Sequence, residues 1–302
     1  MPKIRNMRFK EEYHLYALIT IACWSLAYVL TRLALTYFSV YSLGFWRYFI
    51  ASLTLLGVAV VIKMKMPPKK DWPIFFLSGA LGFFLYMIFF NQGQQMVSAA
   101  TGSIIIATAP VITALLARII YREKLTWLQW LAIGLEFCGV AFLTLINGVV
   151  SVNIGVLWLF LAALVLSFYN LLQRKLTKSY APLQTAAYSI FAGTILLAVF
   201  LPTSVNQAIA APPMQWVYVL ILGVFSSAIA YVAWTKALSV AEKTSQVSNY
   251  MFLTPFLTSV LGFLIAGEIP EQSTIIGGTI ILLGVFLFNY GERLKSFTKP
   301  RN

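Results

Sequence analysis

The chain has 302 residues, of which 60% are hydrophobic and 10% charged, and its formal net charge is +13. A soluble globular domain carries roughly 25% charged residues, so this composition excludes a water-soluble fold and favours the bilayer as the solvent. A charge of this sign in a soluble protein would suggest nucleic-acid binding, so the positions of the basic residues decide what it means here.

Ten apolar stretches along the chain are long enough to cross a bilayer. A spanning helix needs about 20 residues, because the hydrocarbon core is ~30 Å thick and the rise is ~1.5 Å per residue. The predicted spans of the first half are Tyr13–Leu35, Val40–Ile62, Trp72–Phe90, Ala99–Ile120 and Trp127–Ile146. Those of the second half are Gly155–Gln173, Leu183–Leu201, Gln215–Leu238, Ser245–Ala266 and Ser273–Tyr290. The sequence therefore predicts an all-α integral membrane protein with ten transmembrane helices.

All lysines and arginines except Arg32 and Arg47 lie in the two termini, on alternate connections between these spans, or at the span ends next to those connections. With ten spans, the basic segments share one side of the membrane, and the positive-inside rule makes that side and both termini cytoplasmic. The excess charge then reflects topology and contact with anionic lipid, and no nucleic-acid partner is predicted.

The second half of the chain repeats the first. TGSIIIATAPVITALLARIIYREKL, from Thr101, aligns without a gap with QVSNYMFLTPFLTSVLGFLIAGEIP, from Gln246. The same register extends to both sides and pairs Pro110 with Pro255, Glu123 with Glu268, Tyr86 with Tyr231 and Gly139 with Gly284. The earlier helices align as well, with a spacing three residues shorter, and pair Ser25 with Ser167, Arg32 with Arg174 and Trp46 with Tyr188. Because five is an odd number of spans, the halves 1–148 and 149–302 insert upside down relative to each other. Inverted repeats of this kind are typical of secondary transporters.

The spans, the repeat and the pattern Pro110…Arg122-Glu123 with Pro255…Gly267-Glu268 resemble the EamA-type exporters of the drug/metabolite transporter superfamily. Arg32 and the segment Trp46-Arg47-Tyr48 fit the same family, and the resemblance covers nearly the whole chain. It implies export of amino acids or related metabolites, often coupled to protons, through a central cavity between the halves. The chain departs from the family at Arg122, where a glycine is usual, and at Glu136 within the fifth span.

Ionisable residues deep in a membrane are candidates for function. Glu136 lies about nine residues into its helix, near the midplane at a depth of ~13 Å. It is a candidate proton carrier or ligand of a substrate amine, or else a structural glutamate. Arg47 is a candidate ligand of a substrate carboxylate, or the partner of Glu136 in a fixed ion pair. For Arg32, near a helix end, snorkelling to the interface is the favoured interpretation.

Polar and aromatic residues at depth suggest a lined cavity. Besides Arg47 and Glu136, the candidate substrate-binding residues are Trp24, Tyr28, Tyr86, Asn91, Asn170, Tyr231, Trp234 and Asn249. The alternatives are interfacial or packing roles for the aromatic residues and helix-joining roles for the amides.

Two further pairs of residues match between the halves. Pro110 and Pro255 are predicted in the middle of their helices, where a proline kinks the helix, and they are candidate hinges or static kinks. Glu123 and Glu268 stand at helix ends, one on each side, and are candidates for gating or helix-end pairing.

Several functional classes find no support in the sequence. His14 is the only histidine, so no pair of histidines can hold zinc, and there is no Gly-rich phosphate loop. We expect no cofactor, no metal and no catalytic residues, and a chain that is not an enzyme.

The function predicted is secondary transport of small metabolites, amino acids first, out of the cell across the plasma (inner) membrane, with protons as a candidate coupling ion. The alternatives are efflux of drug-like organic cations, a channel, an intramembrane enzyme, and a sensor or scaffold that transports nothing. Monomer and homodimer both stay open.

Overall fold

The computed structural model describes residues 2–121, 125–145, 153–241, 247 and 249–298, and over these residues the chain is helical, with no strand. The first half contains α1 (Pro2–Ala34), α2 (Val40–Val61), η1 (Lys69–Asp71), α3 (Trp72–Gly79), η2 (Ala80–Leu85), α4 (Tyr86–Gln94), α5 (Ala99–Ile106), α6 (Ala109–Tyr121) and α7 (Trp127–Leu145). The second contains α8 (Ile154–Leu176), α9 (Pro182–Leu197), η3 (Ala198–Phe200), α10 (Leu201–Ile209), α11 (Pro213–Ile221), η4 (Leu222–Ile229), α12 (Ala230–Val240), η5 (Asn249–Phe252), α14 (Leu253–Ala266) and α15 (Gln272–Thr298).

Seven helical stretches in the described part are long and apolar enough to cross a bilayer. They run over Tyr13–Ala34, Val40–Val61, Lys69–Gln94, Ala99–Ile120, Ile154–Leu176, Pro182–Ile209 and Pro213–Val240. They coincide with the first four and the sixth to eighth predicted spans. Helices α7, α14 and α15 occupy the other three. The predicted span ends at Ile146 and Ser245, and the boundary between the halves at 148, lie outside the described residues.

Polar side chains begin several of these helices. The Ser39 hydroxyl accepts a hydrogen bond from the backbone N–H of Ser42, and the Ser98 hydroxyl accepts one from Thr101, both over 3.2 Å. The Asn153 side chain accepts from the N–H of Gly155 over 3.0 Å. Lipid offers no partners to the free N–H groups of a first helical turn, so such caps fix where each span starts.

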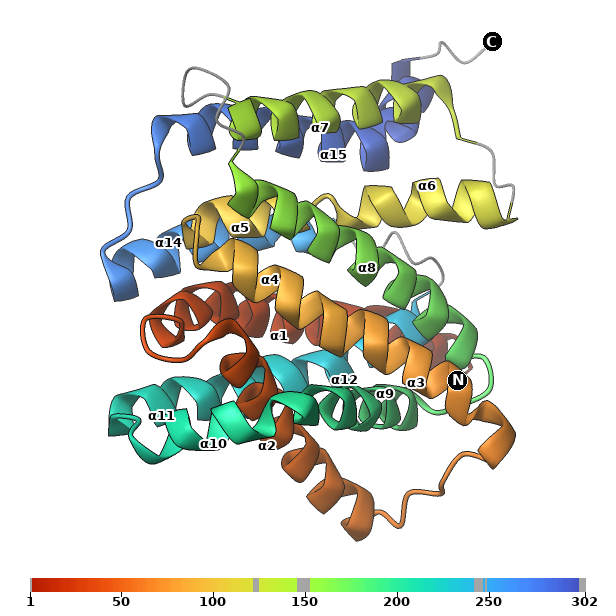
Figure 1. Ribbon diagram of the computed structural model, residues 1–302. Coiled ribbons are helices and arrows are strands. Elements are labelled where there is room, and N and C mark those ends of the chain that lie inside the picture. Colours follow the sequence, from red (N-terminus) through yellow and green to blue (C-terminus); the bar gives the residue numbers. More distant parts are fainter. Residues whose placement is uncertain (1, 122–124, 146–152, 242–246, 248, 299–302) are drawn as a thin grey trace.

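The helices pair in matching ways in the two halves. Helix α1 packs against α12 and α14, while α8, its counterpart in the second half, packs against α4 and α6. Likewise α2 packs against η4, and α3 packs against α9. The last helices of the halves, α7 and α15, lie side by side, as Figure 1 shows near the top of the view. Each of these contacts joins the two halves and has a counterpart in which the halves are exchanged.

Both halves also share one kind of departure from regular α-helix. A π-helical stretch precedes each of the matched tyrosines Tyr86 and Tyr231, as η2 in one half and η4 in the other. Such stretches are rare in proteins, and those that occur are often at functional sites.

The matched prolines are where the structure corrects a prediction. Pro110 is the second residue of α6, after a break at Ala107, and Pro255 is the third residue of α14, after η5. Neither stands in the middle of a continuous helix, because proline lacks the N–H that a helix interior requires and is tolerated in the first turn.

A matched hydrogen bond holds the backbone at each of these breaks. The Ser167 hydroxyl donates to the carbonyl of Ala109 over 2.9 Å, and the Ser25 hydroxyl donates to the carbonyl of Thr254 over 3.5 Å. The two serines match in the repeat, and each acceptor directly precedes a matched proline.

The core at the centre of the molecule is aromatic. The Phe83 ring packs edge-on against Tyr48, Tyr169 and Tyr231, with centroids 5.0, 5.2 and 5.0 Å apart. These rings come from α2, α8, α12 and η2, so the cluster joins elements of both halves.

Candidate functional site

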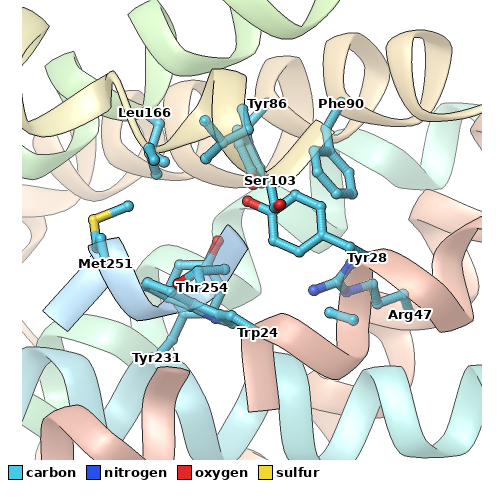
Figure 2. A pocket seen from close by; sticks show the side chains of 13 residues that line it. Trp24, Tyr28, Arg47, Tyr86, Phe90, Ser103, Leu166, Tyr231, Met251 and Thr254 are labelled. Carbon is cyan, nitrogen blue, oxygen red and sulfur yellow. The ribbon is translucent and has the colours of Figure 1, made fainter. Parts of the chain in front are cut away.

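A cavity lies beside this cluster, where helices of the two halves meet (Figure 2). Its empty space, including the part that opens outward, is about 480 Å³. The lining residues come from α1, α2, α4, α5, α8, α12, η5 and α14, and they are Trp24, Ala27, Tyr28, Arg47, Tyr86, Phe90, Ser103, Ile106, Ala107, Leu166, Tyr231, Met251 and Thr254. Five of the predicted substrate-binding residues, Trp24, Tyr28, Arg47, Tyr86 and Tyr231, are among them.

Arg47 supplies the charge of this cavity. The residue is only 3% exposed, and its Nε donates to the Ser227 hydroxyl over 2.7 Å. Its Nη1 is buried without a hydrogen-bond partner in the described part of the chain. The guanidinium carbon lies 5.7 Å from the centre of the Tyr48 ring, and Figure 2 shows the head group turned into the cavity. A buried guanidinium with a free edge is suited to bind a carboxylate with two parallel hydrogen bonds.

Aromatic rings form the walls. Trp24 contacts Tyr231 and Trp234, with ring centroids 5.3 and 5.1 Å apart. On the other side, Phe90 contacts Tyr28 at 5.3 Å and Tyr86 at 5.4 Å. Trp234 is 3% exposed and does not line the cavity, so it supports Trp24 from behind. The walls can hold the apolar body of a ligand against ring faces and edges.

The structure does not bring Glu136 to this cavity. Glu136 is 3% exposed and lies between α7 and α15, where its Cγ approaches Gly284. Its Oε1 has no hydrogen-bond partner among the described residues, and no ion pair joins it to Arg47. The pairing that the estimated depths allowed therefore does not form, because depth along a helix does not specify which way a side chain faces.

The predicted amides have other places. Asn91 is fully buried, and its Nδ2 donates to the carbonyl of Val40 over 2.8 Å, so it joins α4 to α2 outside the cavity. Asn170 does not line the cavity either. The side chain of Asn249 and the whole of Glu123 lie outside the described residues.

Some lining residues were not predicted. Leu166, Ser103, Met251 and Thr254 are small or uncharged, and nothing in their residue type marks them out. Two signals of position could have pointed to the site: the pair Ser226-Ser227 in the eighth span includes the partner of Arg47, and Thr254 directly precedes a matched proline.

Two sets of contacts lie near the ends of the membrane-spanning stretch Tyr13–Ala34 of α1. At the carboxyl end, Arg32 Nε pairs with Glu268 Oε1 at 2.7 Å, and Glu268 Oε2 accepts from the N–H of Ala99 over 2.9 Å. Arg32 also donates to the carbonyl of Val97. At the amino-terminal end, the side chains of His14 and Tyr250 are hydrogen-bonded. The expected snorkelling of Arg32 is thus replaced by an ion pair that ties α1 to the end of α14 and the start of α5.

Known proteins resemble this chain over most of its length. The model of the EamA-like transporter family matches it twice, over residues 12–145 and 153–290. A probable terminal-alkyne amino-acid exporter of Streptantibioticus cattleyicolor is 31% identical, with 94% of this chain and 96% of the relative covered. An S-adenosylmethionine uptake transporter of Rickettsia prowazekii is 23% identical, with 93% and 94% covered.

Two further matches agree with these. The uncharacterized transporter YdfC of Bacillus subtilis is 31% identical, with 88% of this chain and 87% of the relative covered. A solved crystal structure has the same fold, with a TM-score of 0.64 at 17% identity over 96% of this chain and 100% of that one. The chain therefore belongs to the EamA-like transporter family and is a multi-pass small-molecule transporter of the plasma membrane.

Proposed function

We propose that the chain is a secondary active transporter that exports amino acids or related small metabolites by alternating access. In this proposal it crosses the membrane ten times, as two inverted halves, 1–148 and 149–302, with both termini in the cytoplasm, and it is not an enzyme. One observation carries the proposal: a buried Arg47, which forms no ion pair with any described residue, faces an aromatic cavity at the meeting of the two halves.

The paired contacts support two equivalent halves. Matching helix pairs, matching π-helical stretches and the matched Ser25 and Ser167 hydrogen bonds all follow the alignment of the two halves, and the family model matches once in each half. Two inverted halves can exchange conformations, and the exchange turns a site open to one side into a site open to the other.

The cavity supports a substrate with a carboxylate. Arg47 would bind the carboxylate, while Trp24, Tyr28 and Tyr231 would hold the side chain. The name of the Streptantibioticus relative, an amino-acid exporter, supports both the substrate class and the direction. Organic cations are a poorer fit, because a cation would have to be buried beside Arg47.

Glu136 is our candidate for carrying the coupling proton. Its support is a position deep within α7, burial, and an Oε1 without a partner in the described part of the chain. Since the carboxyl group lies outside the cavity, any coupling would act through the packing of α7 on α15 and not through direct contact with the substrate.

The test is counterflow of labelled leucine in proteoliposomes, with wild type beside Arg47→Gln and Glu136→Gln at two pH values. We expect saturable counterflow in wild type and a loss of at least about tenfold in apparent affinity in Arg47→Gln, because a charge-assisted pair is lost. Glu136→Gln should keep counterflow and lose accumulation driven by a proton gradient.

Each alternative gives a different result. If Glu136→Gln lost both modes, the residue would be structural. If wild type showed no counterflow of any amino acid, the substrate class would be wrong. If a dye-like organic cation exchanged instead, the chain would be a cation exporter.

A further inference from the structure

The lining of the cavity carries one cationic group and no acidic one. Arg47 is the only charged residue among the lining residues in the described part of the chain. The described acids with placed side chains lie elsewhere: Glu136 is at the contact of α7 with α15, Glu268 is paired with Arg32, Asp71 is hydrogen-bonded to Tyr180, and Glu271 is exposed. From the described lining, a ligand in this cavity therefore meets a net charge of +1.

Charge balance then ranks the ligands. A monoanion makes the filled cavity neutral, a zwitterion leaves one positive charge, and a monocation raises the charge to two. Burying an uncompensated charge in a medium of low dielectric constant is costly, whereas a charge paired and hydrogen-bonded is tolerated. The order of affinity expected from charge alone is monoanion, zwitterion, cation.

The polar atoms around Arg47 agree with this order. Ser227 holds the Nε, so the buried Nη1 remains free for a carboxylate oxygen. The other polar groups of the lining are neutral, namely the hydroxyls and the indole N–H of Trp24, and the Thr254 hydroxyl is buried without a partner in the described part of the chain. A neutral hydroxyl can bond a keto, hydroxyl or amide group as readily as an amine, so nothing described here demands an ammonium group.

We infer that the cavity selects monocarboxylates with an apolar body and does not require a free ammonium group. Monocarboxylates that lack this group, such as 2-oxo acids and N-acylated amino acids, would then bind at least as well as the free amino acids. This inference rests on the proposed transport function and narrows its substrate class.

The experiment uses four ligands that share a 3-methylbutyl group: 4-methylpentanoate, leucine, 4-methylpentanamide and 3-methylbutylamine. Their binding to the purified full chain in lipid nanodiscs is measured from the rise of the thermal unfolding midpoint with ligand concentration. We expect 4-methylpentanoate to bind at least as tightly as leucine and about tenfold or more tightly than the amide and the amine.

Variants tie this order to Arg47. In Arg47→Met, the acid should lose its advantage over the isosteric amide, and in Arg47→Lys part of the advantage should remain, because the charge stays and the bidentate geometry goes. Lys69→Met removes the same charge from an exposed position and should leave the order unchanged. The unfolding midpoint of ligand-free Arg47→Met should not fall, since removal of a buried unpaired charge does not destabilise the fold.

Three results would overturn the inference: leucine binding tenfold more tightly than 4-methylpentanoate, the amine binding as well as the acid, or no ligand of the series binding to wild type. Counterflow of labelled leucine tests the transport proposal separately from the inferred substrate class. Counterflow with a reversed order of affinity would leave transport standing and remove the substrate class. The expected order without counterflow would keep the site and remove transport.

Discussion

At the residue scale, Glu136 occupies a position that the other half fills with Ile281. A Cβ placed on Gly139 would lie 2.6 Å from Ile281 Cγ1, and one on Gly284 would lie 2.8 Å from Glu136 Cγ, so the two contacts mirror each other. One half therefore packs a hydrocarbon where the other packs a carboxyl group whose Oε1 has no partner among the described residues. An unsatisfied buried polar atom costs roughly 1–3 kcal/mol, which favours a role for Glu136 other than packing.

The substitution Glu136→Ile copies the second half into the first. We expect the free energy of unfolding to rise by about 1–3 kcal/mol, because the unsatisfied carboxyl group is removed, and the thermal midpoint to rise by several degrees. Leucine counterflow should persist and proton-driven accumulation should be lost. A midpoint lower than that of wild type would show that the carboxyl group stabilises the α7–α15 packing, against our interpretation.

The pair Arg32–Glu268 is a second feature at this scale. The Arg32 side chain is 38% exposed and that of Glu268 18%, so solvent screening limits the worth of the ion pair itself to about 1 kcal/mol or less. Glu268 also accepts the N–H of Ala99 at the first turn of α5, and this bond does not depend on the arginine.

A double-mutant cycle separates these two contributions. Thermal unfolding of Arg32→Gln, Glu268→Gln and the double variant should give a coupling of at most about 1 kcal/mol. Glu268→Gln should cost more than this coupling, because it also replaces the charged acceptor at the helix start. A cost of Glu268→Gln no larger than the coupling would contradict a separate role for the bond to Ala99.

At the scale of elements, the close packing of α7 against α15 depends on two glycines, Gly139 and Gly284. A Cβ on Gly139 would meet the carbonyl oxygen of Gly277 at 2.9 Å and the nitrogen of Ile281 at 3.0 Å. These are backbone atoms, so they cannot turn aside as a flexible side chain would. Small residues allow close approach of helices in membranes, where packing drives association.

Gly139→Ala should therefore destabilise the protein by about 1–3 kcal/mol, as overpacking does. Gly134→Ala is the matched control on the same helix, because a Cβ there would meet nothing within 4 Å. The control should be neutral or slightly stabilising, since alanine has the higher helix propensity. The check is the unfolding midpoint of each variant in the same detergent. Equal midpoints would mean that α7 and α15 can move apart without cost.

At the scale of the whole molecule, most of the correct predictions from the sequence came from the internal repeat. Tyr86 and Tyr231 match in the repeat, and Trp24 and Tyr28 are four residues apart, a spacing that puts both on one helix face. All four line the cavity. Glu136 shows the limit of such reasoning, because its depth follows from counting residues whereas its direction is set by the packing of α7 on α15. Met251 and Thr254 reach the cavity through the break before α14, which residue types alone do not reveal.

The number of membrane spans depends on whether α7 crosses the bilayer. Helix α7 has 19 residues and is not among the seven stretches that qualify as spans by length and hydropathy, yet the inverted arrangement requires it to cross. Lys70 and Lys178 flank the third to sixth predicted spans. If all four cross, both lysines face the cytoplasm. If α7 does not, three crossings put them on opposite sides and the halves insert in parallel.

Cysteine labelling of intact cells with a membrane-impermeant thiol reagent distinguishes these topologies, with Cys23 and Cys138 first replaced by alanine. Cysteines at Lys70, at Lys178 and after the last residue should react only once the cells are permeabilised, whereas cysteines at Gln95 and Ala210, on the opposite side, should react at once. Reaction of Lys178→Cys but not Lys70→Cys in intact cells would show that α7 does not cross the membrane. The halves would then not be inverted, and the proposed alternating access depends on that inversion. If the carboxyl-terminal cysteine alone reacted, an odd number of crossings would follow Lys178, and α14 or α15 would not cross the membrane. The expected pattern requires an even number of crossings in each interval, as ten spans with alternating basic connections demand.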